Sequence, residues 1–212
     1  SPVQFNAGLE NEYGIEGSPG LNYWRNPDTG DVIKIEDGCN IKPQCHACFI
    51  KSPSDNLESI LMHAVDEGGI FSSGSGIGGD IGQLRGEGEP LSGGGKSSGP
   101  MSFFKIYDDS AGSIKSGGKS RRAARMQTMR YHHPDSLTFI RSKVREDKKA
   151  LVLMENGYSP GMDGEAYQTV TYQNTNLSVR LDDHFFKQLN DGREIELRNV
   201  TDGKVIKKIP AE

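Results

Sequence analysis

The sequence predicts an α/β fold in which parallel strands alternate with helices. Three observations lead to this prediction: short apolar segments alternate with segments of helical periodicity, turn residues separate them, and hairpin patterns lie near both ends. The chain has 212 residues, the length of one ordinary domain or two small ones. Only 33% of the residues are hydrophobic, but 27 glycines account for much of the shortfall, so we do not expect disorder.

The N-terminal part is expected to be rich in loops and to carry one hairpin. Residues 1–44 contain many Gly, Pro and Asn residues, and a turn signal at 26–30 separates two short strand-like segments. These segments are residues 22–25 and 31–35.

A buried strand and a helix should follow. The run 47–50 is short, apolar and flanked by prolines, which favours a buried strand. Asp55 can cap a helix in which Glu58 reaches back to the first turn, and Gly68 should end it. A further apolar piece begins at Ile70. The apolar stripe expected to face the core consists of Leu57, Ile60, Leu61, Ala64 and Val65.

The remaining elements continue the alternation after a glycine-dense stretch. Residues 68–99 hold too many glycines to build a core. We therefore expect that this stretch either lets the backbone come close to a ligand or gives the chain flexibility. The elements expected after it are a helix at 102–116, an extended segment at 123–131, a helix from Asp135 onward, a strand at 168–172, a helix at 182–189 capped by Asp182, and a hairpin of 193–198 with 204–209.

Composition argues against several classes of function. There are 25 basic and 29 acidic residues, so the whole chain is not a polycation that coats nucleic acid. No run approaches the roughly 18 apolar residues of a membrane-spanning helix, and the start lacks a signal-peptide pattern. We therefore expect a soluble, cytoplasmic protein without a nucleic-acid or membrane partner.

Two glycine motifs resemble nucleotide-binding loops without fitting them. Segment 74–79 satisfies G-x-G-x-x-G, but no helix is expected directly after it. Segments 95–97 and 118–120 resemble the end of a phosphate loop and lack its first glycine. The basic segment 115–130 favours an anion site over a merely solvated basic face, since guanidinium groups beside glycine N–H groups suit phosphate. Its cations are Lys115, Lys119, Arg121, Arg122, Arg125 and Arg130.

Three cysteines and several histidines are candidates for metal or redox chemistry. Cys39, Cys45, His46 and Cys48 could hold zinc, but the second ligand pair of structural zinc sites is missing. We expect no metal site and interpret Cys48 as a buried or redox-active thiol. The histidines expected to be caps or surface residues are His132, His133 and His184.

A series of motifs extends over nearly all of the chain and is highly specific in its order. The motifs are SPVQFNAGL at 1–9, PQCHACFI at 43–50, GSGIG at 74–78, GEGEPLSGGG at 86–95, SSGP at 97–100, IKSGGKSRRAA at 114–124, DGEAY at 163–167 and QNTNLSVR at 173–180. Together they resemble the large chain of the adenosylcobalamin-dependent (class II) ribonucleotide reductases.

The resemblance implies the first half of a ten-stranded α/β barrel, a parallel half-sheet with helices and edge β-hairpins. Residues 1–212 would then be part of one catalytic barrel domain. Its expected parts are a loop- and hairpin-rich segment 1–44, an α/β half-barrel 45–190 and a β-hairpin 191–212.

The resemblance also implies a substrate site. Cys48 matches the barrel-strand thiol that reduces the ribose 2′ position and then becomes half of a disulfide. A buried thiol would suit this role, because a dry site protects radical intermediates. Ser1, Ala47 and Gly76 match positions that contact the substrate together with Cys48, and a side chain at Gly76 would occupy the nucleotide's space.

A regulatory site is implied as well. Asp55 and Arg85 resemble residues of the specificity site, where a deoxynucleoside triphosphate effector binds at a dimer interface and selects the base to be reduced. Ser116, Lys119 and Arg121 lie in a loop that resembles the one linking this effector to the substrate base. The basic segment is thus better interpreted as recognising the effector's triphosphate.

The implied activity is that of a ribonucleoside di- or triphosphate reductase started by adenosylcobalamin through a thiyl radical. The family's radical cysteine, its second disulfide cysteine and most cobalamin contacts would lie beyond Glu212, so we expect the chain alone to be inactive. The partners implied are the remaining segments of the reductase, a ribonucleotide, the effector, a thioredoxin-like dithiol and a second copy in a homodimer. A non-catalytic, effector-binding regulatory subunit is the alternative.

Two departures from the family pattern add expectations. The segment between Val144 and Gly164 looks shorter than in many relatives. Ser1, inside a substrate-contacting motif and without a preceding Met, resembles the downstream side of an intein junction. We therefore expect a split or processed enzyme, with a truncated fragment or a broken gene as the alternative.

Overall fold

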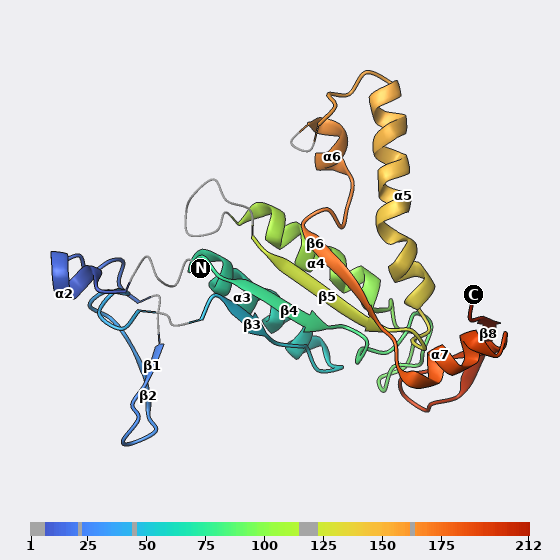
Figure 1. Ribbon diagram of the computed structural model, residues 1–212, viewed down its shortest axis with the longest axis horizontal. Helices are drawn as coiled ribbons and strands as arrows, with labels where there is room; N and C mark the ends of the chain where they lie inside the picture. The colour runs from blue at the N-terminus through green and yellow to red at the C-terminus, as the bar shows by residue number, and fades with distance from the viewer. Residues whose placement is uncertain (1–6, 21–22, 44–45, 115–122, 162–163) are drawn as a thin grey trace.

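The centre of the molecule is a parallel sheet of four strands in the order β3-β4-β5-β6 (Figure 1). The computed structural model describes residues 7–20, 23–43, 46–114, 123–161 and 164–212. The strands are β3 (Cys48–Ile50), β4 (Gly76–Asp80), β5 (Arg125–Arg130) and β6 (Thr175–Arg180). Each strand pairs in parallel with the next, which confirms the predicted class of mixed α/β fold with a parallel sheet.

Two helices pack against each other and build the main core with the sheet. They are α3 (Leu57–Ser72) and α4 (Pro100–Ser113). The core side chains come from these helices, from β5, from the loop after β4 and from the start of α5 (Ser136–Glu155). The buried members of this cluster are Ile60, Ile81, Leu84, Phe104, Tyr107, Met129 and Phe139.

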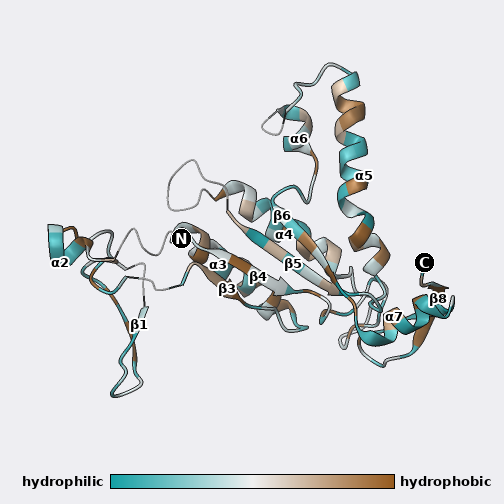
Figure 2. Cartoon of the chain, viewed as in Figure 1, coloured by the Kyte–Doolittle hydropathy of each residue, from teal (hydrophilic) through white to brown (hydrophobic). Residues whose placement is uncertain are grey.

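Helix α5 extends away from the sheet, and the short helix α6 (Glu165–Thr169) lies beside its far part (Figure 1). Ala150, Ala166 and Val170 form a small cluster of their own there. Hydrophobic and hydrophilic residues alternate along α5 in Figure 2. This part of the chain therefore has a separate, smaller core.

Both predicted hairpins are confirmed, and they lie at opposite ends of the sheet in Figure 1. β1 (Tyr23–Arg25) pairs with β2 (Val32–Lys34), with the short helix α2 (Leu9–Tyr13) nearby. β7 (Glu194–Arg198) pairs with β8 (Val205–Pro210). The predicted cap of α7 (Asp183–Asn190) is also confirmed, because Asp182 accepts a hydrogen bond from Phe185 N at 2.9 Å.

Helix α3 differs from its prediction at both ends. Its N-cap is Asn56, whose side chain accepts a hydrogen bond from the backbone three residues on, whereas Asp55 is engaged elsewhere. The helix continues through Gly68 and Ile70 to Ser72. Glycine lowers helix propensity by only about 1 kcal/mol, which tertiary packing overrides here.

The face that α3 buries agrees only in part with the predicted stripe: Ile60 is buried and Ala64 packs against the main core. Leu57 and Val65 are 61% and 64% exposed, and Leu61 is exposed as well. The buried residues of the helix are Ile60, His63, Glu67 and Phe71. Helical spacing was thus right, but the helix is turned so that two polar side chains enter the interior.

Two further predictions were wrong. The strand expected at 168–172 is absent: α6 occupies the first part, and Tyr172 has a φ of 65°, a left-handed conformation that interrupts an extended run. The strand lies instead at Thr175–Arg180. Helix α5 begins directly after Asp135 as predicted, but the Asp135 side chain makes no cap bond to it and instead accepts a hydrogen bond from Glu87 N at 2.9 Å.

None of the helices in the described part of the chain is long and apolar enough to cross a membrane.

Candidate functional site

The described residues matched to substrate contacts lie together where β3 and β4 begin. Cys48 and Gly76 are register partners, and Gly76 N donates a hydrogen bond to Ala47 O at 2.8 Å. A Cβ at Gly76 would lie only 2.9 Å from the carbonyl oxygen of Ala124, just before β5. A neighbouring backbone therefore already excludes a side chain at this position. Ser1 lies outside the described residues.

Cys48 is exposed, which corrects the expectation of a buried thiol. Within the described residues β3 pairs only with β4, so it is an edge strand. Alternation along a strand places Cys48 and Ile50 on one face, and Ile50 is 92% exposed. Phe49 points to the other face and packs beside Phe71 and Ile77. The thiol is thus accessible on an open, partly apolar edge.

The proposed zinc ligands are not brought together by the described residues. Cys39 is half-buried, and its Sγ lies 3.7 Å from Asn40 Oδ1. Cys45 lies outside the described residues. Across the described ranges, no three His, Cys, Asp or Glu side chains are grouped so that they could hold a metal ion.

Asp55 and Arg85 form an ion pair at the start of α3. Arg85 Nε donates to Asp55 Oδ2 at 2.8 Å, and Arg85 N donates to Asp55 Oδ1 at 3.1 Å. A third bond runs from Arg85 Nη1 to Pro90 O at 2.9 Å. Both charged side chains are partly exposed, so the guanidinium is accessible to an anion. The other predicted effector residues, Ser116, Lys119 and Arg121, lie outside the described residues.

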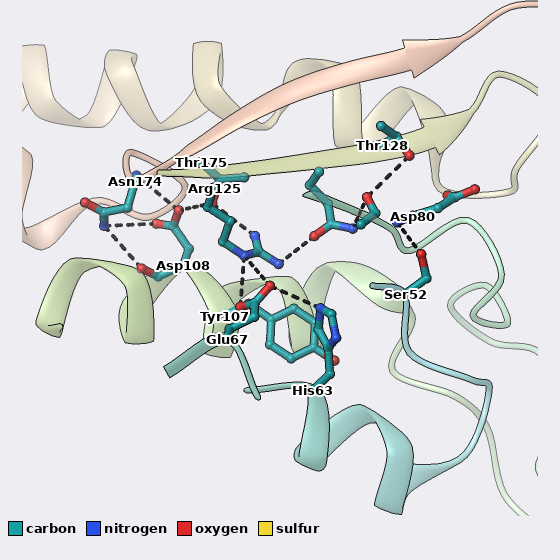
Figure 3. Close-up of polar contacts among 12 residues, drawn as sticks. Ser52, His63, Glu67, Asp80, Tyr107, Asp108, Arg125, Thr128, Asn174 and Thr175 are labelled. Carbon is teal, nitrogen blue, oxygen red and sulfur yellow. Dashed lines mark hydrogen bonds and ion pairs between the residues drawn. The ribbon is translucent and has the colours of Figure 1, made fainter. Parts of the chain in front are cut away.

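A buried polar network joins α3 to β5 and β6 (Figure 3). Arg125 is 2% exposed, and its Nε donates to both carboxylate oxygens of Glu67 at 2.9 and 3.0 Å. Its Nη1 donates to Thr175 Oγ1 at 3.0 Å, and its Nη2 donates to Gln127 Oε1 at 2.5 Å. Arg125 is therefore a structural cation, which corrects its assignment to a basic anion-binding segment.

Aromatic rings and a second carboxylate complete this network. The Arg125 guanidinium lies 5.2 Å from the centre of the Phe104 ring and 5.1 Å from that of Tyr107. Asp108 Oδ1 accepts hydrogen bonds from Thr175 Oγ1 at 2.7 Å and Asn174 N at 3.1 Å. Burial raises the pKa of Asp108 above its usual value, although these donors and the Arg125 charge oppose the change.

His63 is also buried beside this network. Its Nε2 lies 3.1 Å from Glu67 Oε1, and its ring meets the Tyr107 ring edge-on with the centroids 5.0 Å apart. The contact with Glu67 is a close approach without the geometry of a directed hydrogen bond. Burial, followed by the Glu67 charge, raises the pKa of Tyr107, so its hydroxyl stays protonated and donates to Ile60 O at 2.8 Å.

Glu89 connects the loop after Arg85 with the C-terminal hairpin. Its Oε1 accepts hydrogen bonds from Gly86 N at 2.7 Å and Val200 N at 3.0 Å. Its Oε2 accepts from the backbone N and the hydroxyl of Thr201, at 3.0 and 2.6 Å. The carboxylate is therefore satisfied by two segments that are far apart in sequence.

Sequence reasoning missed the buried polar residues. Glu67 lies outside the apolar stripe expected for its helix, and nothing local marks it as the partner of Arg125, 58 residues away. His133 was expected to be a cap or a surface residue, and it acts as a local cap but does not lie on the surface. Its Nδ1 accepts from Asp135 N at 3.0 Å, but the ring is buried and its Nε2 lies 2.9 Å from Leu84 O.

Comparison with known proteins places these residues in a family. Residues 46–211 match the family described as "Ribonucleotide reductase, barrel domain". The chain is 45% identical over 202 residues to the vitamin B12-dependent ribonucleotide reductase of Rhodopirellula baltica, covering 95% of this chain and 19% of the relative. It is 44% identical over 169 residues to the enzyme of that name from Streptomyces coelicolor, covering 80% and 18%.

A more distant relative gives the same result. The vitamin B12-dependent ribonucleoside-diphosphate reductase of Thermoplasma acidophilum is 34% identical over 169 residues, 79% of this chain and 19% of the relative. The chain thus spans about a fifth of the length of these relatives. By the extent of the family match and the level of identity, the chain belongs to the ribonucleotide reductases and corresponds to part of their barrel domain.

Proposed function

We propose that this chain supplies the first half of the ten-stranded α/β catalytic barrel of an adenosylcobalamin-dependent ribonucleotide reductase, which converts ribonucleotides to deoxyribonucleotides. Residues 1–44 would be its N-terminal loop and hairpin segment, 45–190 the half-barrel and 191–212 the closing hairpin. The observation that carries the proposal is the pairing of Cys48 with Gly76 beside Ala47, inside the stretch that matches the barrel domain.

Cys48 is proposed as one of the two reducing thiols. It would supply reducing equivalents at the ribose 2′ position and end as half of a disulfide, with a second cysteine outside this chain as the other half. A thioredoxin-like dithiol would then reduce that disulfide. The exposed position of Cys48 on an edge strand supports both contacts, because substrate and reductant must each reach the sulfur.

The cobalamin cofactor, which would supply the radical that starts the reaction, belongs to the family as a whole. By the resemblance, most of the family's cobalamin contacts lie outside this chain. A cavity of about 810 Å³ lies between the β1–β2 hairpin, β3 and α3. Phe49 and Lys51 line it, and these side chains point to the face of β3 opposite Cys48.

Asp55 and Arg85 are proposed as effector-binding residues at a homodimer interface. The partly exposed Arg85 guanidinium offers N–H donors that suit a phosphate group. Close by in sequence, α3 exposes an apolar face that a second copy of the chain would cover. The exposed side chains of this face are Leu57, Leu61, Met62 and Val65.

The test is reduction of a cytidine nucleotide by the complete reductase with adenosylcobalamin and a dithiol. Cys48→Ser should abolish multiple-turnover reduction, whereas Cys39→Ser should retain it, because Cys39 lies in the N-terminal segment away from the β3–β4 pair. The chain alone should be inactive and should regain activity with the remaining segments. Full turnover by Cys48→Ser would overturn the assignment.

A further inference from the structure

Glu89 is a buried carboxylate that has no counter-ion among the described residues. It is 4% exposed, and among the described residues no Lys, Arg or His forms an ion pair with it. Burying an unpaired carboxylate is costly unless hydrogen-bond donors replace water. Glu89 has four such donors, three from backbone N–H groups and one from the Thr201 hydroxyl.

These donors keep the carboxylate ionised in spite of burial. Burial by itself raises the pKa of Glu89, but the bonds from Thr201, Val200 and Gly86 outweigh it and lower the pKa below its usual value. The contact with the hairpin turn is thus charge-assisted and stronger than one between neutral groups.

The position of Glu89 in the loop connects it to Arg85 from two sides. Gly86, which donates to Glu89, follows Arg85 directly, and Pro90, whose carbonyl accepts from Arg85 Nη1, follows Glu89 directly. The segment 85–90 therefore closes into a compact loop. On its outer side, Glu89 holds the turn of the β7–β8 hairpin.

We propose that Glu89 is a positioning residue for effector recognition: by docking the β7–β8 turn onto loop 85–90, it holds the Arg85 guanidinium in its effector-reading orientation. This inference rests on the proposed effector role of Asp55 and Arg85. It assigns the C-terminal hairpin a part in base selection.

Other bonds anchor the same loop and should preserve its fold when Glu89 is changed. His133 Nε2 lies 2.9 Å from Leu84 O, and Glu87 N donates to Asp135 Oδ2 at 2.9 Å. Loss of the Glu89 contacts should therefore release the hairpin turn and loosen Arg85 without unfolding the domain.

The experiment uses the complete reductase with dATP, dGTP, dCTP and dTTP tested in turn as effectors. Glu89→Gln and Thr201→Val should each raise the effector concentration for half-maximal stimulation by about tenfold, the loss expected for a charge-assisted hydrogen bond. Turnover without effector should stay unchanged. The matched control is Glu87→Gln, an exposed glutamate two residues away, which should behave as the wild type.

Two further variants, Thr201→Ser and Arg85→Ala, distinguish a failure of the Glu89 proposal from a failure of the effector site itself. Thr201→Ser keeps the hydroxyl donor and should restore normal effector response, which a purely structural role would not require. If Arg85→Ala changes effector response but Glu89→Gln and Thr201→Val do not, the role of Glu89 is overturned alone. If Arg85→Ala leaves base selection intact, the effector site itself is refuted and this inference with it. Should Glu89→Gln fail to fold, the two Thr201 variants decide the question.

Discussion

Replacing Arg125 by Met should be among the most destabilising single changes in this chain. Arg125 and Glu67 are 2% and 1% exposed, and the change removes two bonds to Glu67 together with those to Thr175 and Gln127. The Glu67 carboxylate would remain buried with only the close approach of His63. Breaking a buried pair in this way costs about 3 to 5 kcal/mol of unfolding free energy.

The assay is urea denaturation followed by far-UV circular dichroism. With a slope of roughly 2 to 3 kcal/mol per molar urea for a chain of this size, the midpoint should fall by about 1 to 2.5 M. The matched control is Arg130→Met, an exposed arginine at the other end of the same strand, which should change stability by less than about 0.5 kcal/mol.

A double variant tests the physical reason for the loss. Replacing both Arg125 and Glu67 by Met removes the unpaired charge, so it should recover most of the stability that Arg125→Met alone loses. A loss below about 1 kcal/mol for Arg125→Met would refute the reasoning, and so would a double variant as unstable as the sum of the single ones.

Three further predictions concern positions with clear geometry. Gly76→Ala should lower the free energy of unfolding, measured by urea denaturation, by about 1 to 3 kcal/mol, because its Cβ would lie 2.9 Å from a backbone oxygen. Gly78→Ala, whose Cβ would lie 3.9 Å from the nearest atom, should lower it clearly less. Equal effects of the two changes would contradict the clash. Asp108→Ala should lose about 1 to 3 kcal/mol because it leaves two donors unpaired, and Asp108→Asn should lose less. Since the folded-state pKa of Asp108 is raised, the wild type should gain stability relative to Asp108→Asn as pH falls through that pKa toward the unfolded value of 3.8; a gap independent of pH would count against this. The pKa of Glu89 is lowered, so the stability contributed by its ionised carboxylate should be complete above the unfolded pKa of 4.5 and disappear as pH falls through the folded pKa. The melting temperatures of the wild type and Glu89→Gln should then converge below pH 4.5. Divergence of the two in this range would reject the assignment.

Elements defined by nearby residues were predicted well. The turn at 26–30 and the segment around 201–203 lead to the two hairpins found, and Asp182 caps α7 as expected. Each of these features depends on groups a few residues apart, such as a turn residue or a capping side chain. Local chemistry therefore suffices to determine them.

Predictions that depended on the environment of a segment were less reliable. The run 47–50 has the composition of a buried strand, yet in the described part of the chain β3 is an edge strand with Cys48 and Ile50 exposed. The stripe of α3 was assigned by apolarity, whereas the helix buries His63 and Glu67. In both cases what decides burial is the neighbour across the fold, which hydrophobicity along the chain does not reveal.

The sequence by itself determined the α/β class, both hairpins, the family and the candidate residues Cys48, Gly76, Asp55 and Arg85. The tertiary structure alone decided how the buried charges are paired. Glu67 meets Arg125 and Glu89 meets the 200–201 turn across separations of 58 and more than 100 residues. A buried charge is stable only where the fold places hydrogen-bond or ion-pair partners beside it. Its role therefore follows from three-dimensional packing and not from the residues beside it in the chain.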